Sequence, residues 1–113
     1  YSSTKALAVS SDGKVYSSNN AGKTWNDITG SGLTPVSYND IWFDSPSTGI
    51  VAGNDHNLFY GSADNSGAYS WTRLVPASAN NHLRKIFISG DNGLAAGDNG
   101  TLIKLSYDGA AWT

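Results

Sequence analysis

A motif that returns every 44 residues constrains the fold of this chain more than any other feature. A serine followed two positions later by Asn or Asp opens a turn at Ser18, Ser62 and Ser106, which lie 44 residues apart, and a tryptophan follows each turn. The same offset aligns the apolar segments before each turn, so that residues 6–9 fall on 50–53 and 94–97, and residues 15–16 fall on 59–60 and 103–104. Because several independent features share one offset, we interpret the chain as an internal repeat.

A period of this length, built from short apolar segments between polar turns, is typical of the blades of a β-propeller. Glutamate and methionine are absent and no 3.6-residue apolar period is sustained, which disfavours helical repeats. We therefore expect an all-β fold of propeller blades with four antiparallel strands each, about two and three-quarter blades in all. The second repeat predicts strands over residues 39–43, 50–53, 58–62 and 70–74. The predicted blades cover residues 1–37 without a first strand, 38–79, and 80–113 with the last strand cut short.

The turn motif itself resembles a known family. Residues 18–25 read Ser-x-Asn-x-Gly-x-Thr-Trp, which is similar to the Asp-box, or BNR repeat, Ser-x-Asp-x-Gly-x-Thr-Trp. That repeat occurs in sialidases, xyloglucan-cleaving propeller glycosidases, sortilin-type receptors and a photosystem II assembly factor. The first copy carries Asn20 in place of Asp, the second copy is two residues longer and the third is one residue shorter. The positions that match the box are Ser18, Asn20, Gly22, Thr24, Trp25, Ser62, Asp64, Trp71, Ser106, Asp108 and Trp112.

These box residues are expected to build turns rather than to bind a ligand. An Asx side chain accepts hydrogen bonds from the backbone of its own turn, and glycine supplies a positive φ. Each tryptophan is expected to pack its ring between strands or sheets and to anchor the turn, in preference to stacking on a sugar. The resemblance also implies that the box lies away from the functional face.

The residue inventory excludes several kinds of chemistry. All nine acidic residues are aspartates and there is no cysteine, so a glutamate base, a thiolate metal site and a disulfide are excluded within this chain. The sialidases that the box resembles need an arginine cluster and a Tyr/Glu pair, whereas this chain has only Arg73 and Arg84 and no glutamate. A glycosidase that uses two aspartates stays chemically possible. We nevertheless expect that the chain alone is not an enzyme.

Cofactors, metals and nucleic acid are not expected as partners. No phosphate-binding glycine loop is present, His56 and His82 stand far apart, and the Asp-Asn-Gly turns at 91–93 and 98–100 lack the calcium-loop spacing. The net charge is −2 and the basic residues are scattered, which disfavours nucleic acid and acidic membranes. No apolar run reaches the length of a membrane span. The absence of cysteine suits a secreted or extracellular protein.

Recognition through surface loops is the function that remains. In propellers, ligands usually bind the face formed by the loops between the second and third strands and between the last strand and the next blade. The residues expected on these loops are Tyr38, Asp40, Asp55, His56, His82, Arg84, Asp98 and Asn99. Their mixture of hydrogen-bonding and aromatic groups is typical of sites that bind sugars. We expect a glycan-binding, lectin-like module. The alternatives are a protein-interaction scaffold and a fragment of a larger propeller, including a glycosidase.

The number of blades also predicts a partner. A propeller needs about four blades to close, and an open sheet edge is prone to pairing and aggregation. We therefore expect either a homo-oligomer whose copies complete the ring or further blades in a longer chain. Two copies would supply about six blades, which is a permissible ring with cyclic symmetry.

Overall fold

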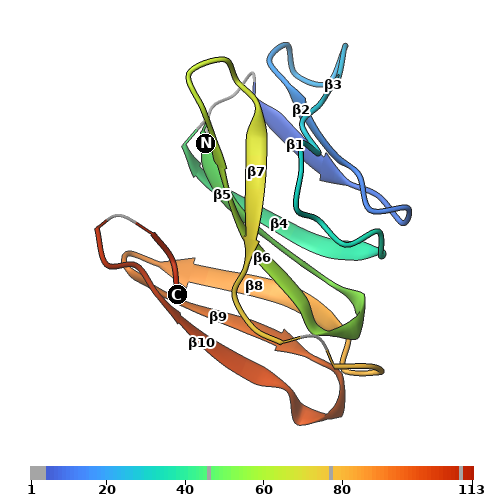
Figure 1. Ribbon diagram of the computed structural model, residues 1–113, viewed down its shortest axis with the longest axis vertical. Helices are drawn as coiled ribbons and strands as arrows, with labels where there is room; N and C mark the ends of the chain where they lie inside the picture. The colour runs from blue at the N-terminus through green and yellow to red at the C-terminus, as the bar shows by residue number, and fades with distance from the viewer. Residues whose placement is uncertain (1–4, 46, 77, 110) are drawn as a thin grey trace.

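The structure of the protein, a computed structural model, describes residues 5–45, 47–76, 78–109 and 111–113. It is all-β and consists of three antiparallel sheets that follow one another along the chain (Figure 1). The first sheet contains β1 (Ala6–Val9), β2 (Val15–Ser18) and β3 (Asn26–Asp27). The middle sheet contains β4 (Tyr38–Ser45), β5 (Thr48–Gly53), β6 (Asn57–Ala63) and β7 (Tyr69–Arg73). The third sheet contains β8 (Leu83–Ser89), β9 (Asn92–Gly97) and β10 (Leu102–Ser106), and two short 3₁₀ turns are η1 (Asn54–His56) and η2 (Asp98–Gly100).

The middle sheet is the centre of the molecule. Its strands pair in chain order, β4-β5-β6-β7, because each hairpin connection is short enough to place the next strand beside the previous one. Strand β5 is apolar on both faces, and five of its six residues are buried, since one neighbouring sheet covers each side. The four strands that the second repeat predicts are thus all present, with ends that differ by one or two residues.

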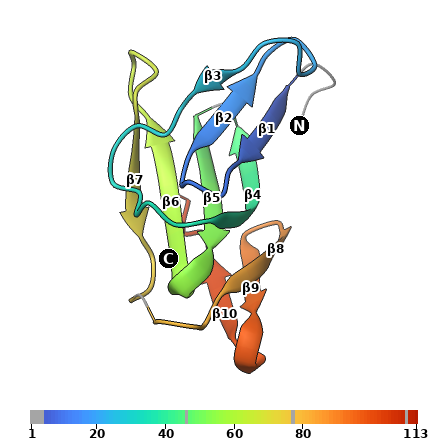
Figure 2. The same cartoon turned by 90° about the vertical axis from the view of Figure 1, so that its right-hand side faces the viewer.

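An aromatic cluster joins the first sheet to the middle sheet. Phe43, Phe59 and Trp71 point from one face of the middle sheet toward Val15 of the first sheet, which is fully buried. The rings of Tyr69 and Trp71 stack at 5.9 Å, and Phe43 meets Trp71 edge-on at 6.2 Å between centroids. Figure 2 shows the first sheet lying across the upper part of the middle sheet, with the chain after β3 passing beside β7 on its way to β4.

A mainly aliphatic cluster joins the middle sheet to the third sheet. Ile50, Ala52 and Leu58 on the opposite face of the middle sheet are fully buried against Ala95 and Leu105. Trp112 adds two ring contacts to this cluster, one edge-on with Trp42 at 5.7 Å and one with Tyr107 at 5.5 Å between centroids. The middle sheet is therefore packed on both faces, whereas the first and third sheets are packed on one face each.

We call faces of two sheets corresponding when their residues lie 44 positions apart in the chain. The two contacts of the middle sheet differ in whether corresponding faces meet. Val15 and Leu7 of the first sheet lie 44 residues before Phe59 and Val51, and all four belong to the same cluster, so corresponding faces meet there. Ala95 of the third sheet lies 44 residues after Val51, yet it packs on the opposite face of the middle sheet. The step from the middle to the third sheet thus brings non-corresponding faces together, and the step from the first to the middle sheet does not.

The third repeat ends where a shortened fourth strand was expected. Among the described residues of this segment, Tyr107 and Trp112 form an isolated bridge. Two hydrogen bonds between Ser106 and Thr113 accompany it, at 3.0 and 2.9 Å. Within the described ranges, no helix is long and apolar enough to cross a membrane.

Candidate functional site

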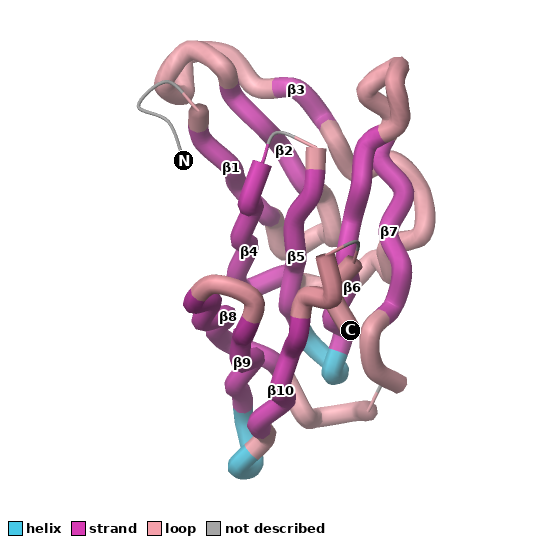
Figure 3. The backbone as a smooth tube through the Cα atoms, turned by 90° about the vertical axis from the view of Figure 1, so that its left-hand side faces the viewer, coloured by secondary structure: helices cyan, strands magenta, loops and turns pink. Residues whose placement is uncertain are grey.

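Two similar turns lie at one end of the molecule, η1 in the middle sheet and η2 in the third sheet (Figure 3). The central residue of each adopts a left-handed backbone, with φ 56° at Asp55 and φ 58° at Asn99. Asp and Asn tolerate this conformation better than most residues, which explains why they stand at these equivalent positions. The sequence therefore builds the same turn twice, 44 residues apart.

Each turn is tied to the chain segment that enters its own sheet. The backbone N–H of Asn54 donates to Ser37 O at 2.9 Å, and that of Asp98 donates to His82 O at 2.8 Å. A glycine precedes each turn, and a Cβ on Gly97 would lie only 2.0 Å from His82 O. Glycine is required there because the two backbones approach so closely.

The linker from β7 to β8 passes between the two turns and binds both. The backbone N–H of Asp55 donates to Nδ1 of His82 at 3.0 Å, and the N–H of Asn80 donates to Oδ1 of Asp55 at 3.3 Å. Because Nδ1 of His82 accepts a hydrogen bond, the proton of the neutral imidazole lies on Nε2. On the other side, Nδ2 of Asn99 donates to Asn80 O at 3.0 Å and to Oδ1 of Asn81 at 3.2 Å.

An ion pair completes this group of side chains. Nε and Nη2 of Arg84 donate to the two carboxylate oxygens of Asp98 at 3.1 and 2.9 Å. The hydrogen bonds from Arg84 hold the pKa of Asp98 below its usual range, and the same contact raises the pKa of Arg84. We call the whole group the linker cluster; its members are Asp55, Asn80, Asn81, His82, Arg84, Asp98 and Asn99.

The linker cluster contains five of the eight residues that the sequence predicts for ligand binding, and a sixth lies beside it. His56 contacts the linker through Nδ1, which lies 2.9 Å from Pro76 O. The sequence reasoning missed Asn80 and Asn81. Their signal was a pair of amide side chains in the linker, directly before His82.

The structure places the other two predicted residues elsewhere. Tyr38 is buried, with 4% of its surface exposed, and its hydroxyl donates to Thr34 O at 2.8 Å, so it belongs to the aromatic cluster. Asp40 links two sheets, because its Oδ2 accepts the N–H of Ile86 at 2.7 Å. Both lie at the beginning of strand β4.

The three box turns have the hydrogen bonds expected of turn formers. Oδ1 of Asn20 accepts the N–H of Thr24 at 2.9 Å, and Oδ1 of Asp108 accepts that of Ala111 at 2.9 Å. Oδ1 of Asp64 accepts the N–H of Ser66 at 2.8 Å, and the Ser66 hydroxyl is the main reason that the pKa of Asp64 is lowered.

The three box tryptophans are not alike. Trp71 and Trp112 are buried as predicted, with 5% and 3% of their surfaces exposed. The same prediction is wrong for Trp25, which is 44% exposed. The reason is the orientation of the first sheet, which turns Leu7 and Val15 toward the middle sheet and leaves the side that carries Trp25 uncovered.

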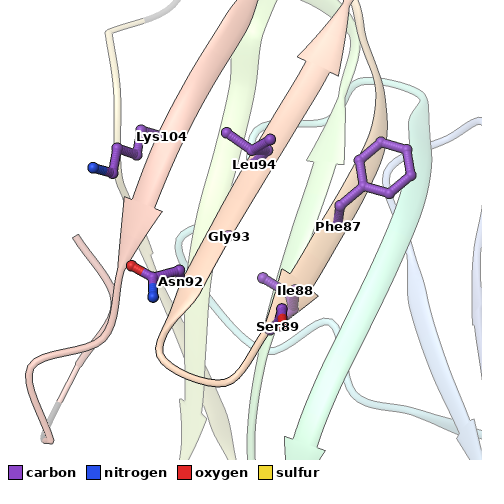
Figure 4. Close-up of a pocket in the computed structure, with 7 residues that line it drawn as sticks. All are labelled: Phe87, Ile88, Ser89, Asn92, Gly93, Leu94 and Lys104. Carbon is purple, nitrogen blue, oxygen red and sulfur yellow. The ribbon is translucent and has the colours of Figure 1, made fainter.

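A shallow apolar hollow of about 460 Å³ lies on the outer face of the third sheet, remote from the linker cluster (Figure 4). Phe87, Leu94 and Lys104 form its exposed wall, and Asn92 lies at its edge. A smaller hollow of about 340 Å³ lies on the first sheet between Ala8, Tyr16 and Trp25. Both hollows are on sheet faces rather than on loops.

Within the described part of the chain, no group of three or more acidic or histidine side chains is arranged to hold a metal ion. Comparison with family models, with curated proteins and with solved structures finds no match for this chain.

Proposed function

We propose that this protein is a non-catalytic recognition module that binds carbohydrate through the linker cluster. The observation that carries the proposal is the gathering of two left-handed turns and one linker at a single end of the molecule. The carboxylate of Asp55 and the guanidinium of Arg84 are both exposed there, at 47% and 53% of the side-chain surface.

The chemistry of this cluster fits sugar hydroxyls, which donate and accept hydrogen bonds at the same oxygen. Among the described residues, Oδ2 of Asp55 receives no hydrogen bond, which makes it an acceptor for a ligand. Nε2–H of His82 and Nη1 of Arg84 are the corresponding donors. A site with paired acceptors and donors on rigid turns favours a diol over an isolated hydroxyl.

Catalysis has less support than binding. A general acid needs a raised pKa, whereas the pKa of Asp98 is lowered and both of its oxygens are held by Arg84. The arrangement of the middle and third sheets, with non-corresponding faces in contact, supports a β-propeller-type fold and a relation to Asp-box proteins. The contact of corresponding faces between the first and middle sheets does not support it. A secreted location belongs to the same proposal.

A glycan array followed by calorimetry with the best ligand tests the proposal. The test variant is Asp55→Asn, which removes the charge and keeps a residue that tolerates the left-handed turn, as Asn99 does in η2. We expect it to weaken binding at least about tenfold, since a hydrogen bond to a charged group contributes about 1.5–3 kcal/mol. Asp91→Asn is the matched control, because it makes the same charge change in the β8–β9 turn, at the opposite end of the third sheet. The proposal is wrong if the wild type binds no glycan, or if both variants bind as tightly as the wild type.

A second candidate function is a scaffold that binds proteins. The observation in its favour is the exposed apolar side of the third sheet, where Phe87 is 57% exposed and Leu102 is 64% exposed. Apolar patches of this kind often mark protein interfaces.

A further inference from the structure

We infer that the outer face of the third sheet binds the outer face of the first sheet in a second copy of this chain. This inference extends the proposed function by naming a partner, and it rests on the packing of the sheets rather than on carbohydrate binding. The two faces are defined by the strand register. The third-sheet face carries Lys85, Phe87, Leu94, Leu102 and Lys104, and the first-sheet face carries Ala8, Tyr16, Trp25 and Asp27.

The four large hydrophobic residues that are exposed in the described chain all lie on these two faces. Trp25 is 44% exposed on the first sheet, and Phe87, Leu94 and Leu102 are 57%, 39% and 64% exposed on the third. The other large apolar side chains of the described chain are buried or half-buried. The most exposed large apolar side chains therefore lie at the two ends of the stack of sheets.

The middle sheet shows that such a face is covered when a neighbouring sheet is present. Leu94 and Leu102 lie 44 residues after Ile50 and Leu58, which are fully buried beneath another sheet of this same chain. The face that a neighbouring sheet covers in the middle of the molecule is thus left open in the third sheet. The chemistry that fits it is another antiparallel sheet with a similar apolar face, and a second copy supplies one.

Charge disfavours one of the faces that a second copy offers. The outward positions of the third sheet include Lys85 and Lys104 and no acidic residue, so two third sheets placed face to face would bring like charges together. The first-sheet face presents Asp27 beside Tyr16, which lowers this repulsion. Lys14 lies near Asp27 as well, so the electrostatic gain is small and apolar contact must supply most of the affinity.

Shape favours the same pairing. The hollow between Ala8, Tyr16 and Trp25 on the first-sheet face has a volume of about 340 Å³, which is large enough to take an aromatic ring. Phe87 is the most prominent aromatic ring of the opposite face. Corresponding faces already meet between the first and middle sheets, so this type of contact has a precedent within the molecule.

The size of the contact predicts weak, concentration-dependent assembly. The first sheet limits the contact, because its strands have four, four and two residues and cover roughly 15 Å by 13 Å, from the usual strand spacing and rise. Such a contact belongs to the small class of interfaces, so we expect a dissociation constant on the order of tens of micromolar. A contact between two different faces either closes into a ring or continues as a filament.

The experiment is light scattering during size exclusion, on the full chain, from about 5 to 500 μM. The variants are Phe87→Glu on the third sheet and Trp25→Glu on the first, with Asn65→Glu in the β6–β7 turn as a control of equal charge. We expect the wild type and the control to gain mass with concentration, and each face variant to stay monomeric. An equimolar mixture of the two face variants should form a one-to-one dimer, because Trp25→Glu keeps an intact third-sheet face and Phe87→Glu keeps an intact first-sheet face.

Several results would overturn the inference. A wild type that is monomeric at every concentration excludes the contact, and assembly that survives either face variant shows that the two faces do not bind each other. Failure of the mixture to form a dimer also contradicts it. Leu102→Glu and Trp25→Thr, at exposed positions, replace any face variant whose circular dichroism differs from that of the wild type. Because the glycan array is measured separately, a monomer that binds glycan would refute this inference and leave the proposed function standing.

Discussion

The two contacts on either side of the middle sheet are built differently. The contact with the first sheet consists of aromatic rings that touch one another, among them Phe43, Tyr69 and Trp71. The contact with the third sheet has a centre of branched aliphatic side chains such as Ile50 and Leu58, and its rings gather around Trp112. Rings are rigid and have preferred angles, whereas aliphatic chains adjust their rotamers. The first contact should therefore tolerate changes of shape poorly, and the second should tolerate them better.

Polar groups reinforce the two contacts in different ways. At the first, Nη2 of Arg73 donates to Asn57 and Thr34 at 2.7 and 2.8 Å, and its guanidinium lies 4.7 Å from the centre of the Phe59 ring. At the second, the carboxylate of Asp40 reaches across to the backbone of Ile86. The guanidinium of Arg73 thus stabilises the contact with the first sheet, and the carboxylate of Asp40 links the middle sheet to the third sheet.

The largest loss of stability is expected when the ring of Trp71, at the centre of the aromatic cluster, is removed. Trp71→Ala removes a ring that packs on Phe43 and Tyr69, and we expect it to lower the free energy of unfolding by about 3–5 kcal/mol. Urea unfolding followed by tyrosine fluorescence measures this change. Trp25→Ala is the control, because Trp25 follows the first box but is exposed, and it should cost less than about 1 kcal/mol. Equal losses of unfolding free energy in the two variants would show that the first sheet packs on the middle sheet through the face that carries Trp25.

Glycine substitutions compare the rigidity of the two contacts directly. A Cβ on Gly61 would lie 2.3 Å from the Trp71 ring, and one on Gly93 would lie 2.5 Å from the terminal methyl group of Ile88. The ring is held by its neighbours, whereas the methyl group can rotate away. We therefore expect Gly61→Ala to cost about 1–3 kcal/mol and Gly93→Ala to cost less than about 1 kcal/mol in chemical denaturation. The reverse order would contradict the view that the aromatic contact is the more rigid one.

The sequence predicted the elements of this fold better than their orientation. The 44-residue offset and the short apolar segments between polar turns predict the four strands of the middle sheet, because local pattern determines where a strand begins and ends. Which face of a sheet meets its neighbour depends on contacts between distant residues. Trp25 and Trp71 occupy matching places after their boxes, yet only Trp71 is buried.

The candidate site shows the same limit. Asp55 and Asn99 are recognisable as turn residues, and the equal spacing of their turns places them at the same end of the molecule. Tyr38 and Asp40 were predicted to bind a ligand, because a strand entrance is often exposed. Here Tyr38 is buried against Phe59 and the Asp40 carboxylate is bonded to the third sheet, which local sequence does not reveal. Asn80 and Asn81 bind the turns only because the linker folds back between them.

A smaller loss of stability is expected when the hydrogen bond from the Ile86 N–H to the Asp40 carboxylate is removed, which links the middle and third sheets. Asp40→Ala leaves the N–H of Ile86 without its acceptor, which should lower the free energy of unfolding by about 1–2 kcal/mol. Asp40→Asn keeps an oxygen acceptor at the same place and should cost less than half as much. Denaturant titration of both variants provides the comparison, together with the hydrogen-exchange rate of the Ile86 amide. An unchanged exchange rate in Asp40→Ala would mean that the carboxylate does not hold this amide.

The smallest expected effect on stability comes from Tyr38 in the aromatic cluster, and it depends on pH. Burial raises the pKa of Tyr38 from 10.0 to about 12. The neutral phenol is therefore favoured in the folded state, so the stability that it contributes is present in full below pH 10 and is lost as the pH rises through 12. At neutral pH, Tyr38→Phe should lose about 1 kcal/mol, because the hydrogen bond to Thr34 disappears.

The informative quantity is the slope of stability against pH rather than its value at neutral pH. Between pH 10 and 12 the wild type should lose about 1–2 kcal/mol more than Tyr38→Phe, since a buried phenolate is unfavourable and phenylalanine cannot ionise. The lysines and the other tyrosines titrate in both proteins, so their contributions cancel in the difference. Urea unfolding at half-unit steps across this range measures the two slopes. Parallel slopes would show that Tyr38 is hydrated in the folded protein, and the aromatic contact would then be looser than the aliphatic one.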